Sequence, residues 1–454
     1  MILGGVGMRQ KANIFENRGI NQHLIKNRDL TFEKEKPKAC CIVDPFVSSE
    51  IIRDALIASG VWPIAILTDQ LHLTSEEQNK RFAVKKFQKV LQYDSTQGID
   101  FADQLQELNI IAVIAGNERT CHLADLIASE LAPTYANSPT TSHFRMDKFE
   151  MQEGVREANL SYIKQIKLQS PTLASTEKDF VSQFDFPIIL KPTNQSGSVG
   201  VARCETITEL EVALHRVLGL ESKYGNKVDA CVAQECITGE EYFVDTVSLH
   251  GQHKVISIYR CPKILYQQFP IYRFIEVIDP NSPQAQVCIS YVKKVLSALD
   301  VKYGMAHTEI FLTDKGPELI EINPRICGAH GFPTRLASLT SGQNQAEFLA
   351  KSLTDEVGFL AEIDEIPALN SYGLIVFLQS WVDKEFKSFA ENTVKQLKSY
   401  HSHKILKPLN QPISAPKDLL DTVAIVMLVN PDREQVQRDY VKLIELEKSD
   451  SLFG

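Results

Sequence analysis

The sequence predicts a multidomain protein in which an α/β region precedes an α+β region. Three observations support this fold class. The chain has 454 residues, about three times the length of a usual domain. Apolar stretches alternate with helical patterns from Ala39 onward, which is typical of an open parallel sheet covered by helices. Further along the chain, several expected strands follow one another directly, which favours antiparallel pairing.

The N-terminal third predicts strands over 39–43, 62–67 and 110–115 and helices over 49–59 and 120–130. This order is that of a βαβ domain, which we place at residues 38–136. The residues before it, 1–37, are polar without a clear period, so we expect an extension. No GxGxxG motif follows these strands, which argues against a dinucleotide site.

A turn cluster at Asn137 to Thr140 begins the middle region, which we place at residues 137–364. The expected elements are a helix over 142–158, a strand over 186–190, a helix over 206–219, strands between 231 and 259, a long proline-containing loop, a helix over 284–299 and a hairpin over 307–323. The last region, 365–454, predicts strands over 373–379 and 423–429 and a helix over 433–445. It reads as a smaller α+β unit.

Composition excludes several classes of protein. The chain is 44% hydrophobic and 23% charged, which is ordinary for globular proteins, and its 48 basic and 57 acidic residues give a net charge of −9. A surface of this sign repels a phosphate backbone, so we expect no nucleic-acid partner.

The sequence also carries no sign of a membrane or of export. Apolar runs such as Val423–Val429 are far shorter than the 18 or so residues of a membrane span. The N-terminus lacks a basic region that would begin a secretory signal. Nine cysteines without a CxxC pair fit a reducing cytoplasm, where we expect the protein to reside.

The hairpin expected at 307–323 carries the sharpest chemical signal. With its turn centred on Lys315, Glu309 lies directly opposite Glu321. Strand alternation then puts His307, Glu309, Glu321 and Asn323 on one face and Thr308, Ile310, Leu312, Ile320 and Ile322 on the other.

Two opposed carboxylates repel each other unless a cation lies between them. Together with the amide oxygen of Asn323, Glu309 and Glu321 form an all-oxygen set suited to Mg²⁺. Arg325, two residues further on, could meet a transferring phosphoryl group. The alternatives are a solvated face of an amphipathic hairpin and, for Arg325, a surface salt bridge to one of these acids.

Two further segments are compatible with a nucleotide. Lys191 ends an apolar strand and is followed by a loop with serines and glycines, whose N–H and hydroxyl groups can approach phosphates. No Walker A motif is present, and a glycine-rich hairpin turn is the alternative. The segment Val232–Phe243 offers a strand edge and a glycine turn that could bind a nucleoside. An ordinary hairpin with a charged turn explains that segment equally well.

In this order, the motifs resemble those of the ATP-grasp superfamily, from about Lys148 to Arg325. The N-terminal βαβ region and the C-terminal unit also lie where that family places its flanking domains. Within the superfamily, the chain looks most like carboxylate-amine ligases of the bacterial L-amino acid ligase, or dipeptide synthetase, type. The basis is Phe274–Pro280, which is similar to an E-x-G-H-x-x-P stretch in which Glu276 would lie near a substrate amino group. Asp279 stands where that stretch usually has histidine, which leaves the substrate open.

The resemblance implies a role for each matching residue. Lys148 and Lys191 would hold ATP phosphates under the loop Ser196, Gly197, Ser198 and Gly200. Gln234, Glu235 and Ile237 would bind adenine and Glu241 the ribose. Glu309, Glu321 and Asn323 would hold Mg²⁺, with Mn²⁺ as a substitute, and Arg325 would stabilise an acyl phosphate. Gly328 and His330 lie in a segment similar to the family's substrate loop.

The function implied is ATP-dependent joining of a small-molecule carboxylate and an amine, with amino acids as expected substrates and ADP and phosphate as products. The resemblance also suggests a homodimer. Two alternatives remain: another ATP-grasp ligase or carboxylase that uses bicarbonate or a purine precursor, and a non-catalytic nucleotide-binding protein.

Overall fold

The computed structural model describes residues 36–68, 82, 84–94, 105, 107–195, 199–220, 227–267, 269–417 and 419–454. Residues Pro37–Gly454 form one compact unit, separate from Met1–Lys36. The expected extension at 1–37 therefore lies almost wholly outside the described residues. The divisions near residues 137 and 365 stay predictions.

The N-terminal sheet is parallel, as the sequence predicts, with strand order β3-β2-β1-β4. Its elements are β1 (Lys38–Val43), α1 (Ser49–Ala58), β2 (Trp62–Thr68), β3 (Lys89–Tyr93), β4 (Asn109–Ala115), a 3-10 turn (Glu118–Thr120) and α4 (Cys121–Leu131). β3 was not predicted, because only Leu91 among its five residues is buried and the apolar signal is correspondingly weak.

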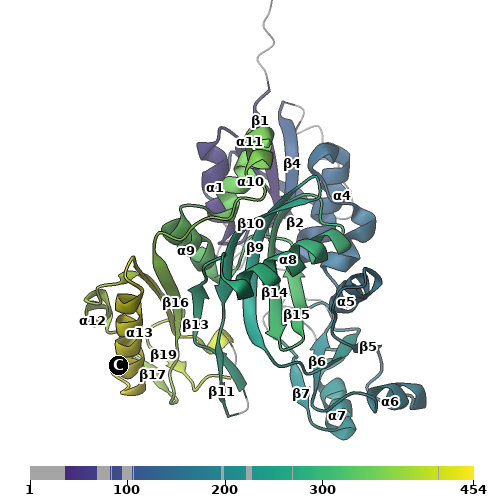
Figure 1. Ribbon diagram of the computed structural model, residues 1–454, viewed down its shortest axis with the longest axis vertical. Helices are drawn as coiled ribbons and strands as arrows, with labels where there is room; N and C mark the ends of the chain where they lie inside the picture. Colours follow the sequence, from purple (N-terminus) through teal and green to yellow (C-terminus); the bar gives the residue numbers. More distant parts are fainter. Residues whose placement is uncertain are drawn as a thin grey trace, which may run out of the picture. The chain divides into compact units, whose positions relative to one another are not determined.

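A second, four-stranded antiparallel sheet has the order β5-β8-β6-β7. It is built from β5 (Gln165–Leu168), α6 (Ser175–Val181), β6 (Ile188–Pro192), β7 (Ala202–Cys204), α7 (Ile207–Val217) and β8 (Cys231–Glu235). Leu190 of β6 and Leu214 of α7 belong to its buried core. Figure 1 shows this sheet at the lower right, with α6 and α7 beside it.

The helix expected over 142–158 is interrupted. A 3-10 helix covers Pro139–Arg145, and α5 begins afresh at Lys148 and ends at Glu157. The break occurs because the Asp147 side chain accepts hydrogen bonds from the N–H groups of Phe149 and Glu150, at 2.8 and 3.1 Å. Such an N-cap replaces the carbonyl partners that a continuous helix would supply.

The largest sheet has eight antiparallel strands in the order β15-β14-β9-β10-β13-β16-β20-β18. The strands are β9 (Glu240–Leu249), β10 (Gln252–Arg260), β13 (Phe274–Val277), β14 (Gly304–Thr313), β15 (Gly316–Asn323), β16 (Tyr372–Leu378), β18 (Tyr400–Ile405) and β20 (Ala424–Asn430). The strands of the last region thus extend the same sheet as the acidic hairpin.

Helices and small ribbons complete the fold. They are α8 (Pro283–Ala298), a 3-10 turn (Ala329–Gly331), α9 (Phe332–Ser341), α10 (Gln345–Thr354), α11 (Glu356–Ala361), α12 (Glu391–Lys395), a 3-10 turn (Leu419–Asp421), α13 (Arg433–Lys448), the pair β11 (Lys263–Tyr266) and β12 (Phe269–Tyr272), and the pair β17 (Lys384–Phe386) and β19 (Gln411–Ile413). The loop expected after residue 259 was wrong, because β11, β12 and β13 fill most of it.

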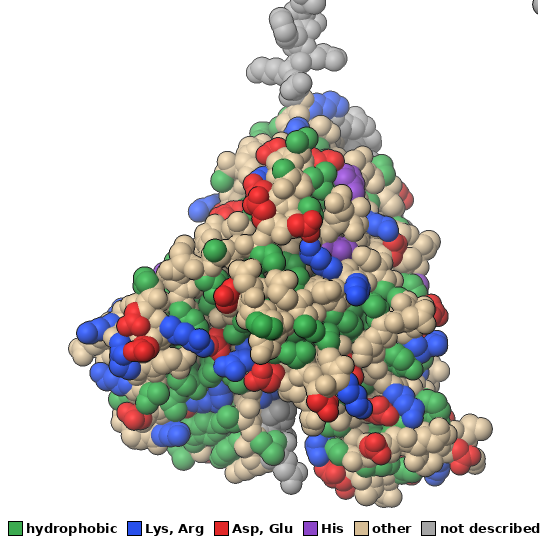
Figure 2. All heavy atoms as spheres, viewed as in Figure 1, with side chains coloured by type: hydrophobic (Ala, Val, Ile, Leu, Met, Phe, Trp, Pro, Cys, Tyr) green, Lys and Arg blue, Asp and Glu red, His purple; other side chains and the backbone are tan. Residues whose placement is uncertain are grey.

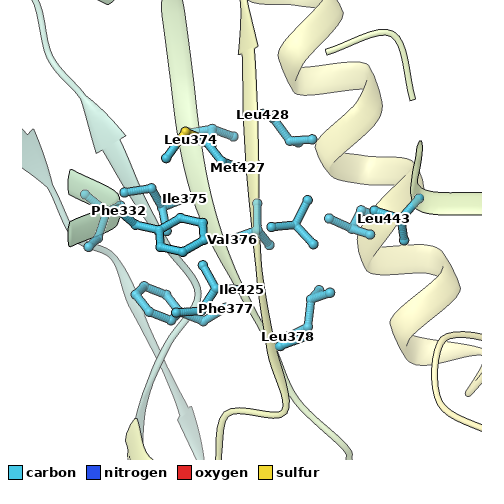
Figure 3. Packing of buried hydrophobic residues seen from close by; sticks show 14 of the residues in the cluster. Phe332, Leu374, Ile375, Val376, Phe377, Leu378, Ile425, Met427, Leu428 and Leu443 are labelled. Atoms are coloured by element: carbon cyan, nitrogen blue, oxygen red, sulfur yellow. The ribbon is translucent and has the colours of Figure 1, made fainter. Parts of the chain in front are cut away.

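Apolar side chains cover both faces of the large sheet. On one face, Val244, Ile310 and Ile322 pack with α8, which crosses in front of β9, β10 and β14 in Figure 1. On the other, Val247 and Met305 pack with residues of α1 and α10. A third core joins β16 and β20 to α9 and α13, and Figure 3 shows its side chains interdigitating.

No helix among the described residues is long and apolar enough to cross a membrane. All nine cysteines are free thiols, and only Cys236 is more than slightly exposed. Figure 2 shows basic side chains intermingled with acidic ones on the face drawn, so the net charge is not gathered in one acidic patch there.

Candidate active site

The acidic hairpin has the pairing that the sequence predicts at its functional end. Glu309 of β14 lies opposite Glu321 of β15, and His307 lies opposite Asn323. Directly opposed residues share a face, so the two carboxylates and the amide lie together. The side chains of Glu309 and Glu321 are one-fifth exposed or less, which keeps them close to the protein interior.

The turn of this hairpin differs from the prediction. Thr313 pairs with Gly316, so the turn is not centred on Lys315, and a bulge between Glu309 and Ile310 shifts the register by one residue. Ile320 is the extra residue, and Leu319 takes the core position expected for it. A β-bulge of this kind re-aims the residues beyond it.

Lys148, the first residue of α5, forms an ion pair with one carboxylate of this pair, that of Glu321. Its Nζ lies 2.6 Å from Glu321 Oε2 and donates to the Gln195 carbonyl at 3.0 Å. Burial lowers the pKa of Lys148, but the charges of Glu321 and Glu309 outweigh it and the pKa is raised. Burial raises the pKa of Glu321, yet Lys148 and then Lys191 bring it below its usual value.

Lys191 of β6 faces the same group from the second sheet. Burial lowers its pKa to about 8, and the neighbouring charge of Lys148 acts in the same direction. Glu321 and Glu309 oppose the shift without cancelling it. A lysine whose charge is under-compensated in this way can bind an anionic group.

The donor set fits Mg²⁺. Glu309, Glu321 and Asn323 offer oxygen atoms, which are the ligands that this hard cation prefers. Asn323 Nδ2 donates to Glu321 Oε1 at 3.3 Å, and Asn323 Oδ1 accepts from Arg325 Nη2 at 3.3 Å. The amide therefore joins the carboxylates to the guanidinium in one hydrogen-bonded row.

Arg325 is held by a residue that sequence reasoning missed. Its Nε donates to Glu118 Oε2 at 2.8 Å, and its Nη1 donates to the Ile326 carbonyl at 2.9 Å. Glu118 follows β4, at the carboxyl edge of the N-terminal parallel sheet. Ligands of open α/β sheets bind at that edge, so the position of Glu118 was the available signal.

The residues expected to bind the nucleoside lie along β8 and β9. Gln234 is buried, and its Nε2 donates to Gln165 at 3.1 Å, while Glu235 lies 3.8 Å from Lys164. Ile237 lies half-buried in the connection between β8 and β9, where its backbone groups belong to no strand.

Glu241 is buried and forms an ion pair with Lys263, while the Tyr272 hydroxyl donates to it at 3.4 Å. Burial raises the pKa of Glu241, although Lys263 counters the shift. Lys263 was missed because it lies in β11, within the segment expected to be a loop. In this arrangement Lys263 is the ion-pair partner of the Glu241 carboxylate, which was expected to bind ribose.

Part of the expected phosphate loop, Ser196, Gly197 and Ser198, lies outside the described residues. Gly200 has φ +75°, and a Cβ there would come within 2.9 Å of Pro192. Before the loop, Gln195 is buried and accepts a hydrogen bond from Arg119 at 3.0 Å. Backbone strain and close packing therefore both favour glycine at position 200.

The structure does not bring Glu276 to this group. Glu276 pairs with Arg260, Arg260 with Tyr242, and Tyr242 with Ile310, so these four side chains share one face of the sheet. That face packs against α8, whereas Glu309 points from the opposite face. A glutamate in the local segment Glu276–Pro280 carries no signal of which sheet face it will occupy.

Both oxygens of Glu276 are already engaged. Arg260 Nη2 lies 2.6 Å from Oε2, Arg433 Nη2 lies 3.2 Å from Oε1, and the Tyr372 hydroxyl donates to Oε1. Asp279 is exposed and accepts a hydrogen bond at 2.9 Å from the backbone N–H two residues later. Glu276 lies on the sheet face opposite to that of Glu309.

The expected substrate loop follows Arg325 directly. A Cβ added to Gly328 would lie 3.8 Å from Arg325 Nη1, so this loop backs onto the guanidinium. His330 and Gly331 have φ of +56° and +74°, and a Cβ on Gly331 would lie 2.5 Å from Ile51 of α1. Burial lowers the pKa of His330, as do the charges of Lys404 and Arg335.

The lysine pair, the opposed carboxylates and the arginine together could hold a phosphorylated ligand, and comparison with known proteins points to a class of protein that binds one. Residues 184–333 match a family model described as an ATP-grasp domain. This region is therefore an ATP-grasp domain, which confirms the resemblance drawn from the motifs. Lys148 lies outside the matched residues.

Two proteins of known name are similar to this chain in sequence. Dapdiamide A synthase of Enterobacter agglomerans is 27% identical over 260 residues, which are 57% of this chain and 60% of the synthase. D-alanine–D-alanine ligase of Bacillus licheniformis is 26% identical over 234 residues, 48% of this chain and 62% of the ligase. The matched segments thus span less than two thirds of these relatives.

The fold extends the likeness beyond the matched segments. The crystal structure of an L-amino acid ligase from Bacillus licheniformis aligns with a TM-score of 0.71, covering 91% of this chain and 98% of that one at 17% identity. The mixed fold, with a parallel N-terminal sheet followed by antiparallel sheets, is that of this ligase structure. The predicted fold class is confirmed.

Proposed function

We propose that this protein is an ATP-dependent ligase that joins a carboxylate to an amine through an acyl phosphate, with amino acids as substrates. The observation that carries the proposal is the row of groups from Lys148 through Glu321 and Asn323 to Arg325. It places two cations on either side of a pair of opposed carboxylates. ATP-grasp enzymes use ATP with Mg²⁺, and the row matches both needs.

In this reaction the acidic residues would bind the metal ion and the lysines would bind phosphate oxygens. Glu309, Glu321 and Asn323 would hold Mg²⁺, which when bound supplies charge compensation for the transferring phosphoryl group. Lys148 would exchange its partner Glu321 for a phosphate oxygen when ATP enters. Lys191, whose positive charge is under-compensated, would bind a second phosphate oxygen.

The first reaction step would form a bond between a carboxylate oxygen of the substrate and the γ-phosphorus. The bond between that phosphorus and the β,γ-bridging oxygen breaks, and ADP leaves with the electron pair. Arg325 would turn from Glu118 to the acyl phosphate and stabilise its charge. Because both cations already have anionic partners, binding replaces one ion pair with another and does not leave a buried charge alone.

In the second step, the amine nitrogen would attack the acyl carbon. The C–O bond to phosphate breaks, phosphate leaves, and the amine proton is lost to solvent as the amide forms. Backbone N–H groups of the loop at Gly328 to His330, which lies beside Arg325, would meet the developing oxyanion. No cysteine is needed as a nucleophile.

Release of ADP and phosphate in the presence of amino-acid pairs tests the proposal, with mass detection of the amide. Turnover that no carboxylate and amine pair stimulates would refute it. Turnover that depends on bicarbonate would instead favour a carboxylase-like member. The homodimer and the cytoplasmic location stay predictions that this assay does not address.

A further inference from the structure

We propose a second cation site, for a thiophilic divalent metal such as Zn²⁺, formed by Cys327 Sγ, His307 Nε2 and Glu309 Oε1, with Asp245 orienting the imidazole. This site does not depend on the proposed ligase activity. It lies beside the oxygen-rich group and differs from it in ligand chemistry, because a thiolate and an imidazole favour zinc over magnesium.

Three elements bring the ligands together. His307 and Glu309 lie two residues apart on β14 and so face the same way, and Asp245 lies opposite His307 on β9. Cys327 comes from the loop after β15. Asp245, His307 and Cys327 each offer a ligand atom within 4.8 Å of the others.

The distances fit a tetrahedral metal. His307 Nε2 lies 3.8 Å from Cys327 Sγ and 3.6 Å from Glu309 Oε1. Zinc bonds of about 2.1 Å to nitrogen and oxygen and about 2.3 Å to sulfur would separate these pairs by about 3.6 and 3.4 Å. A few tenths of an ångström of movement would therefore bring Cys327 Sγ and Glu309 Oε1 each to the separation from His307 Nε2 that a shared ion requires.

The other imidazole nitrogen is already set for metal binding. His307 Nδ1 lies 2.7 Å from Asp245 Oδ1, and in the tautomer that donates this hydrogen bond Nε2 is the nitrogen left to face Cys327 and Glu309. A carboxylate, a histidine and a metal in this order are a recurrent arrangement in zinc proteins. The ring is further fixed by Phe243, whose centroid lies 4.9 Å away in an edge contact.

The residues of this site are largely buried, so a bound cation would offset negative charge that water cannot reach. The exposed fractions are 1% for Asp245, 5% for His307 and 4% for Cys327, and Asp245 Oδ2 has no hydrogen-bond partner among the described residues. The carboxylates of Asp245 and Glu309, the latter one-fifth exposed, thus lie on either side of one buried imidazole. Binding would release the thiol proton to solvent and place a divalent charge between thiolate and carboxylate.

A metal here would tie β14 to the loop that carries Arg325 and Gly328. Glu309 would use Oε1 for this ion, which leaves Oε2 for the Mg²⁺ site. With three protein ligands, the fourth position would hold water.

The test is metal analysis of the full chain, purified without chelators and without a polyhistidine tag. We expect about one zinc per chain in the wild type. Cys327→Ser and His307→Ala should lose it, and Cys288→Ala, a buried thiol of α8 on the other face of the sheet, should keep it. Asp245→Asn should retain the site with affinity about 10- to 100-fold lower.

A cobalt titration of the wild-type protein, stripped of zinc, removes any dependence on variants that fail to fold. One equivalent of Co²⁺ should produce a thiolate-to-metal charge-transfer band. Wild-type protein without zinc and without this band would overturn the proposal, as would zinc retained by Cys327→Ser. Neither readout requires ATP turnover, so failure of the ligase assay leaves this test intact.

Discussion

The lowered pKa of Lys191 predicts how the affinity for ATP should change with pH. Burial is the largest cause of the fall from the usual value near 10.5 to about 8, followed by the charge of Lys148 on α5. Lys263 on β11 adds to the fall, and Glu321 and Glu309 reduce it. A phosphate oxygen bound at Lys191 would favour its charged form and raise the pKa again.

The size of the effect follows from this difference. With a pKa of about 8, Lys191 is about nine-tenths charged at pH 7 and about one-tenth charged at pH 9. Above pH 8, ATP binding must therefore be accompanied by proton uptake. We expect the affinity for ATP to fall about tenfold between pH 7 and pH 9, because the free protein increasingly lacks the charge that the complex needs.

Isothermal titration calorimetry of Mg-ATP across this range measures the affinity, and two buffers of different ionisation enthalpy give the proton uptake. Lys191→Arg is the matched control, since arginine stays charged throughout and should give a nearly flat profile. Equal slopes for the wild type and Lys191→Arg would refute the assignment of Lys191 as the phosphate-binding group that titrates.

Three further predictions concern turnover and stability. Glu321→Gln should reduce ADP release about a hundredfold or more, whereas Glu318→Gln on the same strand should keep most of it. Gly331→Ala should lower the free energy of unfolding by about 1–3 kcal/mol more than Gly60→Ala. Both glycines have positive φ, but only at position 331 would the added Cβ collide with a neighbour, Ile51 of α1. Equal melting temperatures of the two variants would contradict this. Burial lowers the pKa of His253 to about 4, so between pH 6.5 and pH 4 the unfolded chain binds a proton that the folded chain does not. The free energy of unfolding should therefore fall as the pH drops through this range. Chemical denaturation should show a smaller fall for His253→Gln than for the wild type.

The charged residues of the site could be predicted from the sequence more readily than the residues that hold them in place. Glu309 and Glu321 were paired on the assumption of a turn centred on Lys315. The actual turn would shift their register by one residue, and the extra residue Ile320 restores the pair. Lys191 could be found from its place after an apolar strand. Glu118 could not be linked to Arg325, because 207 residues separate them and only the packing of the N-terminal sheet brings them together.

The errors have physical causes of the same kind. Glu276 was expected in the substrate site from a local motif, but three successive strand pairings decide which face of the sheet it occupies. The break before Lys148 depends on one capping aspartate within an otherwise helical pattern. The strands β11, β12 and β13 have four residues each, and β12 carries a proline, which locally favours a loop.

The bulge at Ile320 has a consequence for how this hairpin can vary. In a hairpin with a two-residue turn, directly opposed residues differ in number by an odd amount, as Ile310 and Leu319 do. Glu309 and Glu321 differ by an even amount, and only the additional residue between them makes the pair meet. Metal-ligand spacing in this hairpin therefore obeys a parity rule. A single-residue insertion or deletion elsewhere in β15 would turn one carboxylate toward α8, whereas an even change in the turn would leave the pair intact.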